Sequence, residues 1–536
     1  MKKILFIAAA SILAAVIAST AQNRFDAGQK LRMAEAAVAQ LYVDTVNEDK
    51  LVEAAIRGML EELDPHSSYS TPEETREFNE PLAGNFGGIG IVFNMSSDTL
   101  YVIQTVNGGP SERVGMLAGD RIIEVNDTVI AGKKMKNRDI MRRLRGPKGT
   151  DVEVKVLRRT GNAAADTIDF RITRADIPIY SVDAAYMVDP TTGYIRVNKF
   201  GAETAKEVRT AIRDLKKKGM KDLMLDLVDN GGGYLQAAVE ILGEFLSPGS
   251  LAVYTEGLNS PRQNLKAGPG GLTPLFDEGR LVVMVNQYSA SSSEITSGAI
   301  QDWDRGLIVG RRTFGKGLVQ RPIPFPDGSM IRLTTAHYYT PTGRDIQKPY
   351  TKGDQKAYEK DILDRFNSGE LMHADSVKYV DSLRTETLRN HRVIYGGGGI
   401  YPDRFVPLDT TANTKYYRNV VAKGALNRYA IDFVDSHRKE LKRRYKDGDA
   451  FVKGFEVDSL MLRSLYDMAE ADGVEYDADQ AALSQPLFKT VLKALIGRDI
   501  YDNATYFKVI NIDDPIFKAA YDLIRSDDYT RLLEGE

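Results

Sequence analysis

The densest chemical signal in this sequence lies in residues 285–320, VNQYSASSSEITSGAIQDWDRGLIVGRRTFGKGLVQ. They overlap an apolar run at 281–285 that predicts a buried strand. A serine cluster follows, and then Ile295, Ala299 and Ile300 recur at helical spacing. A serine at such a strand-to-helix junction lies near the positive end of the helix dipole, beside backbone N–H groups that can receive an oxyanion. The pattern indicates a nucleophile, although serines also serve as ordinary helix N-caps.

Lys316 can act as the base for such a serine if its amine is neutral. Lowering a lysine pKa by about 3 units costs about 4 kcal/mol, and burial among apolar groups produces shifts of that size. Lys316 lies between two glycines, with Phe314 and Leu318 as apolar neighbours. None of the histidines lies in a Gly-x-Ser-x-Gly context, so the sequence offers no support for a Ser/His/Asp arrangement.

Residues 310–317 also come close to the phosphate-binding pattern G-x-x-x-x-G-K-[ST]. Two departures count against this alternative. Gly317 stands where the motif needs a magnesium-binding Ser or Thr, and Pro322 and Pro324 interrupt the region where it needs a helix. Nucleotide binding is therefore the less favoured alternative.

Three features of this stretch together resemble the carboxyl-terminal processing peptidases, also called tail-specific proteases. They are the serines before Glu294-Ile295, the Gln-Asp pair at 301–302, and the box Thr-Phe-Gly-Lys-Gly at 313–317. The resemblance implies a nucleophile, a lysine base downstream of it and a glutamine that orients the lysine amine. In this sequence the implied catalytic residues are Ser291, Lys316 and Gln320.

Residues 226–233, Asp-Leu-Val-Asp-Asn-Gly-Gly-Gly, resemble the family's glycine turn. The resemblance implies an oxyanion hole built from the backbone N–H of Gly232 or Gly233 and that of Ser292. Val228 stands where an arginine is common, and Gly231 where a proline is common. Residues 63–69 match the family's N-terminal helical cap, so His66 is interpreted as a structural turn residue.

Residues 84–173 change to short strands, with a helix predicted at 137–144, and resemble a PDZ domain. The glycine-rich segment before the first long strand is similar to the loop whose N–H groups hold a peptide's terminal carboxylate. Taken alone, such a segment is usually a plain turn. The implied peptide-binding residues are Phe86, Gly87, Gly88, Ile89, Gly90 and Ile91.

The order of these segments predicts an α/β (α+β multidomain) chain with a core of the crotonase and Clp-protease type of β-superhelix. We expect a signal peptide at 1–21, an N-terminal helical segment at 22–83, a PDZ domain at 84–175, a Ser/Lys peptidase core at 176–350, and a mostly helical C-terminal region at 351–536, including a core-associated strand near 395–406.

Local signals place several helices in this scheme. Residues 26–63 are predicted to be helical, with Asn47 as an N-cap in their second half. Near the C-terminus, Ser484 before Pro486 and Asp514 before Pro515 are expected to begin two helices.

Composition narrows the function further. Lys and Arg number 71 against 74 Asp and Glu, a net charge of −3, which provides no general attraction for nucleic acid. The absence of cysteine excludes disulfides, cysteine–zinc sites and cysteine nucleophiles. No motif calls for a metal or another cofactor.

The first residues predict export. Lys2 and Lys3 precede an apolar run at 4–18, and Ser19, Thr20 and Ala21 resemble a cleavage site. We expect cleavage after Ala21 and a periplasmic mature protein; an uncleaved N-terminal anchor is the alternative.

Taken together, the sequence predicts an exported serine endopeptidase that captures free C-terminal tails of proteins or peptides through its PDZ domain. In the family, movement of that domain can gate the site. The alternative is a non-catalytic PDZ scaffold that binds peptides on the same fold. The region at 351–536 could mediate a homo-oligomer or dock an adaptor.

Overall fold

The computed structural model describes residues 26–96, 98–106, 108–158 and 165–536. The expected signal peptide at 1–21 lies outside these residues. Within the described ranges, no helix has the length and apolar character needed to cross a membrane.

A six-stranded sheet occupies the centre of the protein, in the order β10–β11–β12–β15–β16–β21. β10 runs antiparallel to β11, and the other neighbours are parallel. All five residues of β15 are buried, as expected for a parallel strand covered on both faces. The strands are β10 (Val182–Met187), β11 (Thr192–Val197), β12 (Asp222–Asp226), β15 (Leu281–Val285), β16 (Leu307–Gly310) and β21 (Arg404–Phe405).

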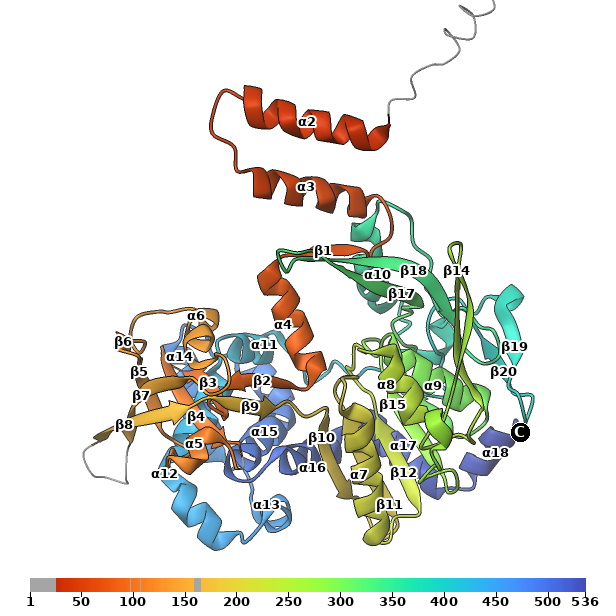
Figure 1. Cartoon of the computed structure of the whole chain (residues 1–536). Helices are drawn as coiled ribbons and strands as arrows, with labels where there is room; N and C mark the ends of the chain where they lie inside the picture. Colours follow the sequence, from red (N-terminus) through yellow and green to blue (C-terminus); the bar gives the residue numbers. More distant parts are fainter. Residues whose placement is uncertain (1–25, 97, 107, 159–164) are drawn as a thin grey trace, which may run out of the picture.

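Helices from distant parts of the sequence cover the two faces of this sheet (Figure 1). Val283 and Val285 of β15 pack with α7 (Thr204–Lys217), α8 (Leu235–Leu242) and α9 (Ser292–Asp302). Val282 and Met284 point the other way, to α17 (Pro515–Arg525), which α18 (Asp528–Glu534) follows. The end of the C-terminal region is therefore a layer of the core, in addition to the expected strand near 395–406, which is present as β21.

A second sheet, of five strands, lies beside the first and carries the segment after Lys316. Its order is β1–β18–β13–β14, with β17 paired to β18. β1 links the N-terminal helices to this sheet. The strands are β1 (Ser68–Ser70), β13 (Leu251–Gly257), β14 (Ser260–Lys266), β17 (Leu318–Pro324) and β18 (Met330–Tyr339).

The expected PDZ domain has its own sheet and its own apolar core. The sheet order is β3–β4–β5–β7–β8, with β6 on β5, so β3 is an edge strand. Two short paired strands, β2 (Asn85–Gly88) and β9 (Ala175–Pro178), carry the chain in and out. The other elements are β3 (Ile91–Ser96), β4 (Thr99–Thr105), α5 (Pro110–Arg113), β5 (Arg121–Val125), β6 (Thr128–Val129), α6 (Asn137–Leu144), β7 (Asp151–Arg158) and β8 (Asp166–Thr173).

The N-terminal segment is helical, as expected, but the stretch at 26–63 forms two helices. These are α2 (Ala27–Leu41), which lies at the outer edge of the molecule (Figure 1), and α3 (Glu48–Glu61), whose Arg57 donates to the Tyr69 carbonyl of β1. Asn47 caps α3 by accepting from the Lys50 N–H. A third helix, α4 (Pro72–Ala83), leads from β1 to the expected PDZ domain.

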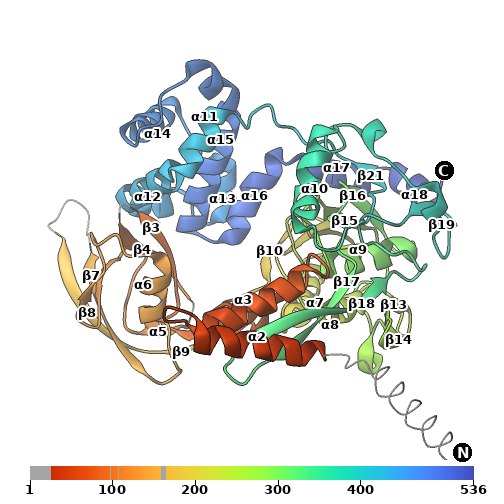
Figure 2. The ribbon, with the colours of Figure 1, turned by 90° about the horizontal axis from the view of Figure 1, so that it is seen from above.

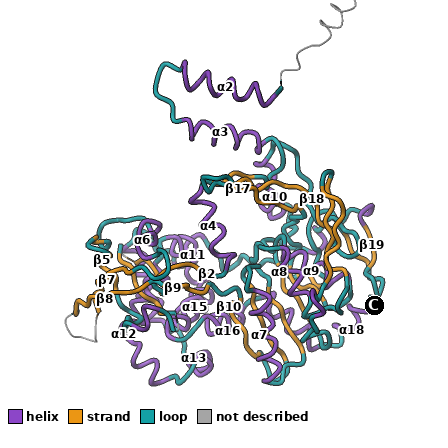
Figure 3. The backbone as a smooth tube through the Cα atoms, viewed as in Figure 1, coloured by secondary structure: helices purple, strands orange, loops and turns teal. Residues whose placement is uncertain are grey.

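The C-terminal helices form a separate apolar cluster next to the PDZ strands (Figures 2 and 3). Asp435 of α12 forms an ion pair with Arg121 of β5, which joins the two units. The helices of this cluster are α11 (Lys415–Ala422), α12 (Ala425–Arg444), α13 (Gly448–Gly454), α14 (Ser459–Ala471), α15 (Ala478–Ile500) and α16 (Asn503–Asp513). The first part of the C-terminal region lies outside this cluster and contains α10 (Gln355–Asn367) and the paired strands β19 (Arg384–Glu386) and β20 (Val393–Tyr395).

One of the two expected helix starts is wrong. Asp514 does cap α17, whose first residue is Pro515. Ser484, however, lies inside α15, and Pro486 is also an interior residue of that helix. The Ser484 hydroxyl donates to the Ala412 carbonyl, a tertiary contact that the local pattern does not reveal. Burial of α15 through residues such as Phe488 and Leu492 offsets the roughly 3 kcal/mol that an interior proline costs.

We expect Leu523→Ala to lower the free energy of unfolding of the core by about 2 to 5 kcal/mol, because it leaves a cavity between α17 and the central sheet. Urea titration followed through Trp303, the single tryptophan, measures this effect. Lys518→Ala, an exposed change on the same helix, is the matched control. Equal midpoints for the two variants would contradict the assignment of α17 to the core.

Candidate active site

Ser291 lies at the N-terminus of α9, in the loop that follows β15. Its backbone has φ 57° and ψ −114°, a region that residues with a side chain rarely adopt. Such a conformation costs on the order of 1–3 kcal/mol and persists only where surrounding contacts impose it. The helix N-terminus places a positive potential beside the Ser291 hydroxyl.

Lys316 precedes β17 and its side chain is largely removed from solvent. Its Nζ donates to Gln320 Oε1 at 3.1 Å, and Gln320 Nε2 donates to the His66 carbonyl at 2.8 Å. Burial lowers the pKa of the Lys316 amine, and the nearby Arg332 guanidinium lowers it further. Glu294 and Asp64 oppose that shift without reversing it.

A second buried lysine shows why Lys316 differs. Lys348 also lies next to the loop at 313–317, and burial lowers its pKa too. Its Nζ, however, forms an ion pair with Asp361 at 3.0 Å, which favours the charged form. Among the described residues, Lys316 has no such carboxylate partner, so its amine is the better candidate for a neutral base.

Glu294 connects Ser291 to Lys316. Its carboxylate is fully buried. One oxygen accepts from the backbone N–H groups of Ser291 (2.8 Å) and Lys316 (2.9 Å). The other accepts from the Gly315 N–H (2.7 Å) and the Thr313 hydroxyl (2.5 Å). Burial raises the pKa of Glu294 to about 7.

Tyr338 of β18 closes the same junction from the opposite sheet. Its buried hydroxyl lies between the carbonyl oxygens of Ser291 and Lys316, 3.2 Å from the first, and it contacts the second as a donor. Together with Glu294 it holds the main chain at Ser291 and at Lys316 in one place.

The glycine turn lies against Ser291. A Cβ on Gly232 would come within 2.8 Å of the Ser291 Cβ and 3.0 Å of the Ser292 nitrogen, so only glycine allows this approach. The Gly232 N–H already donates to Asn230 Oδ1. The N–H groups of Gly233 and Ser292 have no acceptor among the described residues. Of the two alternatives for the oxyanion hole, this geometry favours Gly233 with Ser292.

Side chains from neighbouring strands hold the turn where the sequence departs from the family. Arg196 of β11 binds Asp226 at 2.6 Å and the Val228 carbonyl at 3.0 Å. Asn230 is fully buried, and its amide donates to the Val197 carbonyl. Its own carbonyl accepts from the Ser293 hydroxyl and the Ala290 N–H. Gly231 is exposed and touches nothing that a proline would displace.

His66 has the structural position expected of it. Its ring contacts the Tyr358 hydroxyl at 2.8 Å, and its carbonyl accepts from Gln320. Burial, aided by the charge of Lys316, lowers the pKa of His66 to about 3. The ring is therefore neutral at pH 7, and the N-terminal cap acts on the site through Gln320.

Ser291 and Lys316 come from one loop system but are not hydrogen-bonded to each other in this state. In this state the Lys316 amine donates a hydrogen bond to Gln320 Oε1. A strand, β17, follows Lys316 where a phosphate-binding loop needs a helix, so the nucleotide alternative fails on topology.

The loop at 86–91 forms part of the β2–β9 ribbon and of the turn into β3. Phe86 lies under Arg145, Gly87 accepts from the Gly146 N–H, and Gly88 ends β2. The N–H groups of Ile89 and Gly90 have no acceptor among the described residues. Ile91 begins β3, and Gly90 has a φ of 75°, which turns the chain between the two strands. The loop can therefore receive a carboxylate.

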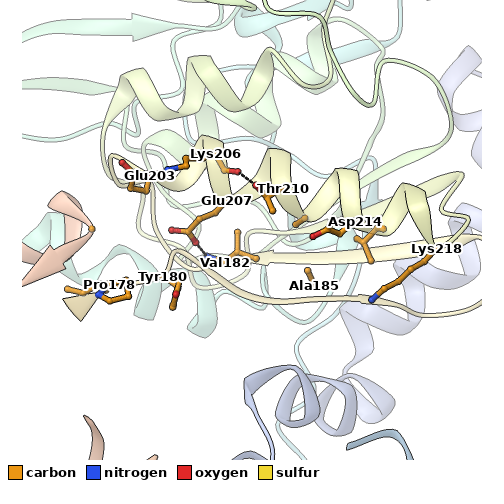
Figure 4. A pocket seen from close by; sticks show the side chains of 14 residues that line it. Pro178, Tyr180, Val182, Ala185, Glu203, Lys206, Glu207, Thr210, Asp214 and Lys218 are labelled. Atoms are coloured by element: carbon orange, nitrogen blue, oxygen red, sulfur yellow. Dashed lines mark hydrogen bonds and ion pairs between the residues drawn. The ribbon is translucent and has the colours of Figure 1, made fainter. Parts of the chain in front are cut away.

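A groove between α7 and β10 lies away from all these residues (Figure 4). It is lined by apolar residues such as Val182 and Ala185, with Glu203, Asp214 and Lys218 at its rim. Glu207 accepts from the Ser181 and Val182 N–H groups, where the chain returns from β9 to the core. None of the predicted site residues contributes to this groove, so it belongs to the junction between the units.

Sequence reasoning missed several residues that position the site. Asn230 lies inside the quoted glycine turn, where its neighbour Gly231 could have drawn attention to it. Arg196 and Tyr338 lie in ordinary strand patterns and gave no local signal. Arg344, which forms an ion pair with buried Asp302, also became visible only in the structure.

Comparison with known proteins gives four matching family descriptions. Peptidase family S41 matches residues 191–357, a PDZ domain matches 87–172, the N-terminal domain of the activating protease CtpB matches 10–75, and a family of unknown function matches 416–502.

Two curated relatives and one solved structure extend these matches. The carboxy-terminal-processing protease of Bartonella bacilliformis is 36% identical over 57% of this chain and 69% of its own length. The carboxy-terminal processing protease CtpB of Bacillus subtilis is 32% identical over 73% of this chain and 80% of its own. The structure of a photosystem II D1 C-terminal processing protease is 31% identical, covers 59% of this chain and 89% of that one, and has a TM-score of 0.32.

Proposed function

Because the chain belongs to the carboxy-terminal processing proteases, with a peptidase S41 region and a PDZ domain, we propose that it is a serine endopeptidase that uses Ser291 and Lys316. The observation that carries the proposal is a single buried carboxylate. Glu294 binds the backbone N–H of both residues, and it thereby holds a strained serine and an amine without an ion-pair partner in one junction.

In the proposed reaction the neutral Lys316 amine takes the proton from the Ser291 hydroxyl, and Oγ attacks the substrate carbonyl. A neutral amine has two N–H groups and one lone pair. Donation of one N–H to Gln320 leaves the lone pair free to face Oγ once the side chain turns from its present rotamer. The oxyanion is received by the Gly233 and Ser292 N–H groups.

The Lys316 ammonium then gives its proton to the leaving amine, so that the peptide C–N bond breaks and an ester to Ser291 remains. Water attacks this ester, Lys316 takes up a proton from the water, and the acid product leaves as Ser291 regains its hydrogen. No cofactor takes part in this proposed sequence.

We also propose that the PDZ domain holds the free carboxylate of the substrate tail. The unpaired N–H groups of Ile89 and Gly90 support this role, together with the open edge of β3, to which an extended tail could add as a strand. The described arrangement, in which Lys316 donates to Gln320, is interpreted as the resting state. A peptide-binding scaffold without catalysis remains the alternative that the first experiment below separates.

We expect Ser291→Ala to abolish tail cleavage and fluorophosphonate labelling, a loss of at least about 1,000-fold, because the attacking oxygen is gone. Labelling is measured with and without a tail peptide, so that a latent enzyme is also detected. Ser247→Ala, an exposed serine of the same core, should label and cleave like the parent protein. Binding of tails without turnover by the parent protein would support the scaffold instead.

We expect kcat/KM for a tail peptide to rise as the pH increases through neutrality. Glu294, with a pKa raised to about 7, must be ionised to accept from the Ser291 and Lys316 N–H groups, and Lys316, with a lowered pKa, must lose its proton. Both requirements favour higher pH. The profile from pH 5 to 9 measures the effect, with Lys316→Arg as an inactive control. An activity that is highest at pH 5 would contradict both roles.

We propose that the protein is exported, on the pattern of charged, apolar and small residues at 1–21. Expression of the full chain in a bacterial host, followed by fractionation and N-terminal sequencing, tests this proposal. We expect a periplasmic chain that begins after Ala21. An intact N-terminus in the membrane fraction would instead indicate the uncleaved anchor.

A further inference from the structure

Basic residues are concentrated along α6 and the loop before it. Asp139, on α6, is the single acidic residue between 131 and 150, and the loop before α6 contains no acidic residue. Cationic side chains there are Lys133, Lys134, Lys136, Arg138, Arg142, Arg143, Arg145 and Lys148. The whole chain has a net charge of only −3, so the positive charge at 131–150 is a local feature and does not reflect the overall composition.

Part of this charge is already matched by carboxylates. Glu73 of α4 forms ion pairs with Arg142 and, at 3.8 Å, with Arg138, while Glu80 of α4 pairs with Arg145. These contacts show that one flank of α6 pairs with acidic side chains of a neighbouring helix. Salt can screen them, because most of the side chains involved are at least one-third exposed.

The lysines of the loop before α6 are not paired with carboxylates in this way. Lys133, Lys134 and Lys136 are exposed and form no ion pair among the described residues. The Asp98 carboxylate accepts from the Lys134 backbone N–H, and among the described residues it forms no ion pair with the Lys134 ammonium. Three exposed ammonium groups within four residues, none of them in an ion pair among the described residues, favour an anionic ligand.

The loop at 131–136, here called the lysine loop, contacts the end of β3 that lies far from Ile89 and Gly90, and this position indicates the ligand that its lysines would meet. A tail bound at Ile89 and Gly90 by its carboxylate would run antiparallel to β3, towards the end of that strand. At that far end, the hairpin between β3 and β4 binds the lysine loop: the Asp98 carbonyl accepts from the Gly132 N–H at 3.0 Å. β3 has six residues, each advancing about 3.3 Å, so this end lies beside residues upstream of the tail's terminus.

We propose that Lys133, Lys134 and Lys136 select protein tails that carry aspartate or glutamate about three to five residues before the C-terminal residue. This inference rests on the proposed capture of tails by the PDZ domain. It adds the chemical class of the substrate: the carboxylate loop recognises the end of the chain, and the lysine loop recognises acidic side chains upstream of it. Because the lysines are exposed, their effect is on affinity and association rate and depends on salt.

The experiment uses the full chain with Ser291→Ala, so that binding is measured without turnover. Three fluorescent ten-residue peptides are identical except at the third to fifth positions before the C-terminal residue, which carry Glu, Gln or Lys. Fluorescence anisotropy gives their affinities at 0.05 and 0.5 M NaCl. We expect the Glu peptide to bind about fivefold more tightly than the Gln peptide at low salt, and the difference to shrink at high salt.

The site is tested by a triple variant, Lys133→Gln, Lys134→Gln and Lys136→Gln. It should bind the Glu and Gln peptides equally and keep the parent affinity for the Gln peptide, which also shows that the groove is folded. The matched control makes the same charge change on α7 and its C-cap, with Lys206→Gln, Lys217→Gln and Lys218→Gln, and should keep the preference.

The outcomes separate this inference from the proposed function. If the parent protein binds all three peptides equally, or if the triple variant keeps the preference, the selection of acidic tails is wrong while tail capture stands. If none of the peptides binds, the proposed capture of tails fails, and the inference fails with it.

Discussion

One buried carboxylate organises the candidate active site. Glu294 accepts hydrogen bonds from the main chain at Ser291, Gly315 and Lys316 and from the Thr313 hydroxyl. A buried anion is costly unless its oxygens are satisfied, so the two loops must stay together to keep it so. This constraint explains why a serine with an unfavourable backbone conformation and a partly buried lysine can occupy the same junction.

Both ends of the described chain contribute to that junction or to its support. His66, in the N-terminal cap, accepts from Gln320, which in turn accepts from Lys316. Near the C-terminus, α17 covers the face of the central sheet opposite α9. The region after residue 350 is therefore part of the core as well as a helical unit, and the PDZ domain contacts it through Arg121 and Asp435.

Much of the fold could be predicted because local patterns agreed with it. The helix at 137–144 and the cap at Asp514 were correct, since each is determined by short-range spacing and capping. Ser484 was misassigned because a tertiary contact outweighed the local proline signal. The catalytic assignment of Ser291, Lys316 and Gln320 stays a prediction, which the hydrogen bond between the last two supports but does not test.

The sequence alone determined the family, the residue types at the candidate site and the order of the segments, because motifs and periodicity are written in neighbouring residues. Tertiary structure decided which of these residues meet. The contact of Tyr338 with the carbonyls of Ser291 and Lys316, the support of the glycine turn by Arg196, and the pairing of α4 with α6 join residues far apart in the chain. Such contacts depend on how sheets and helices pack, and packing leaves no local pattern in the sequence.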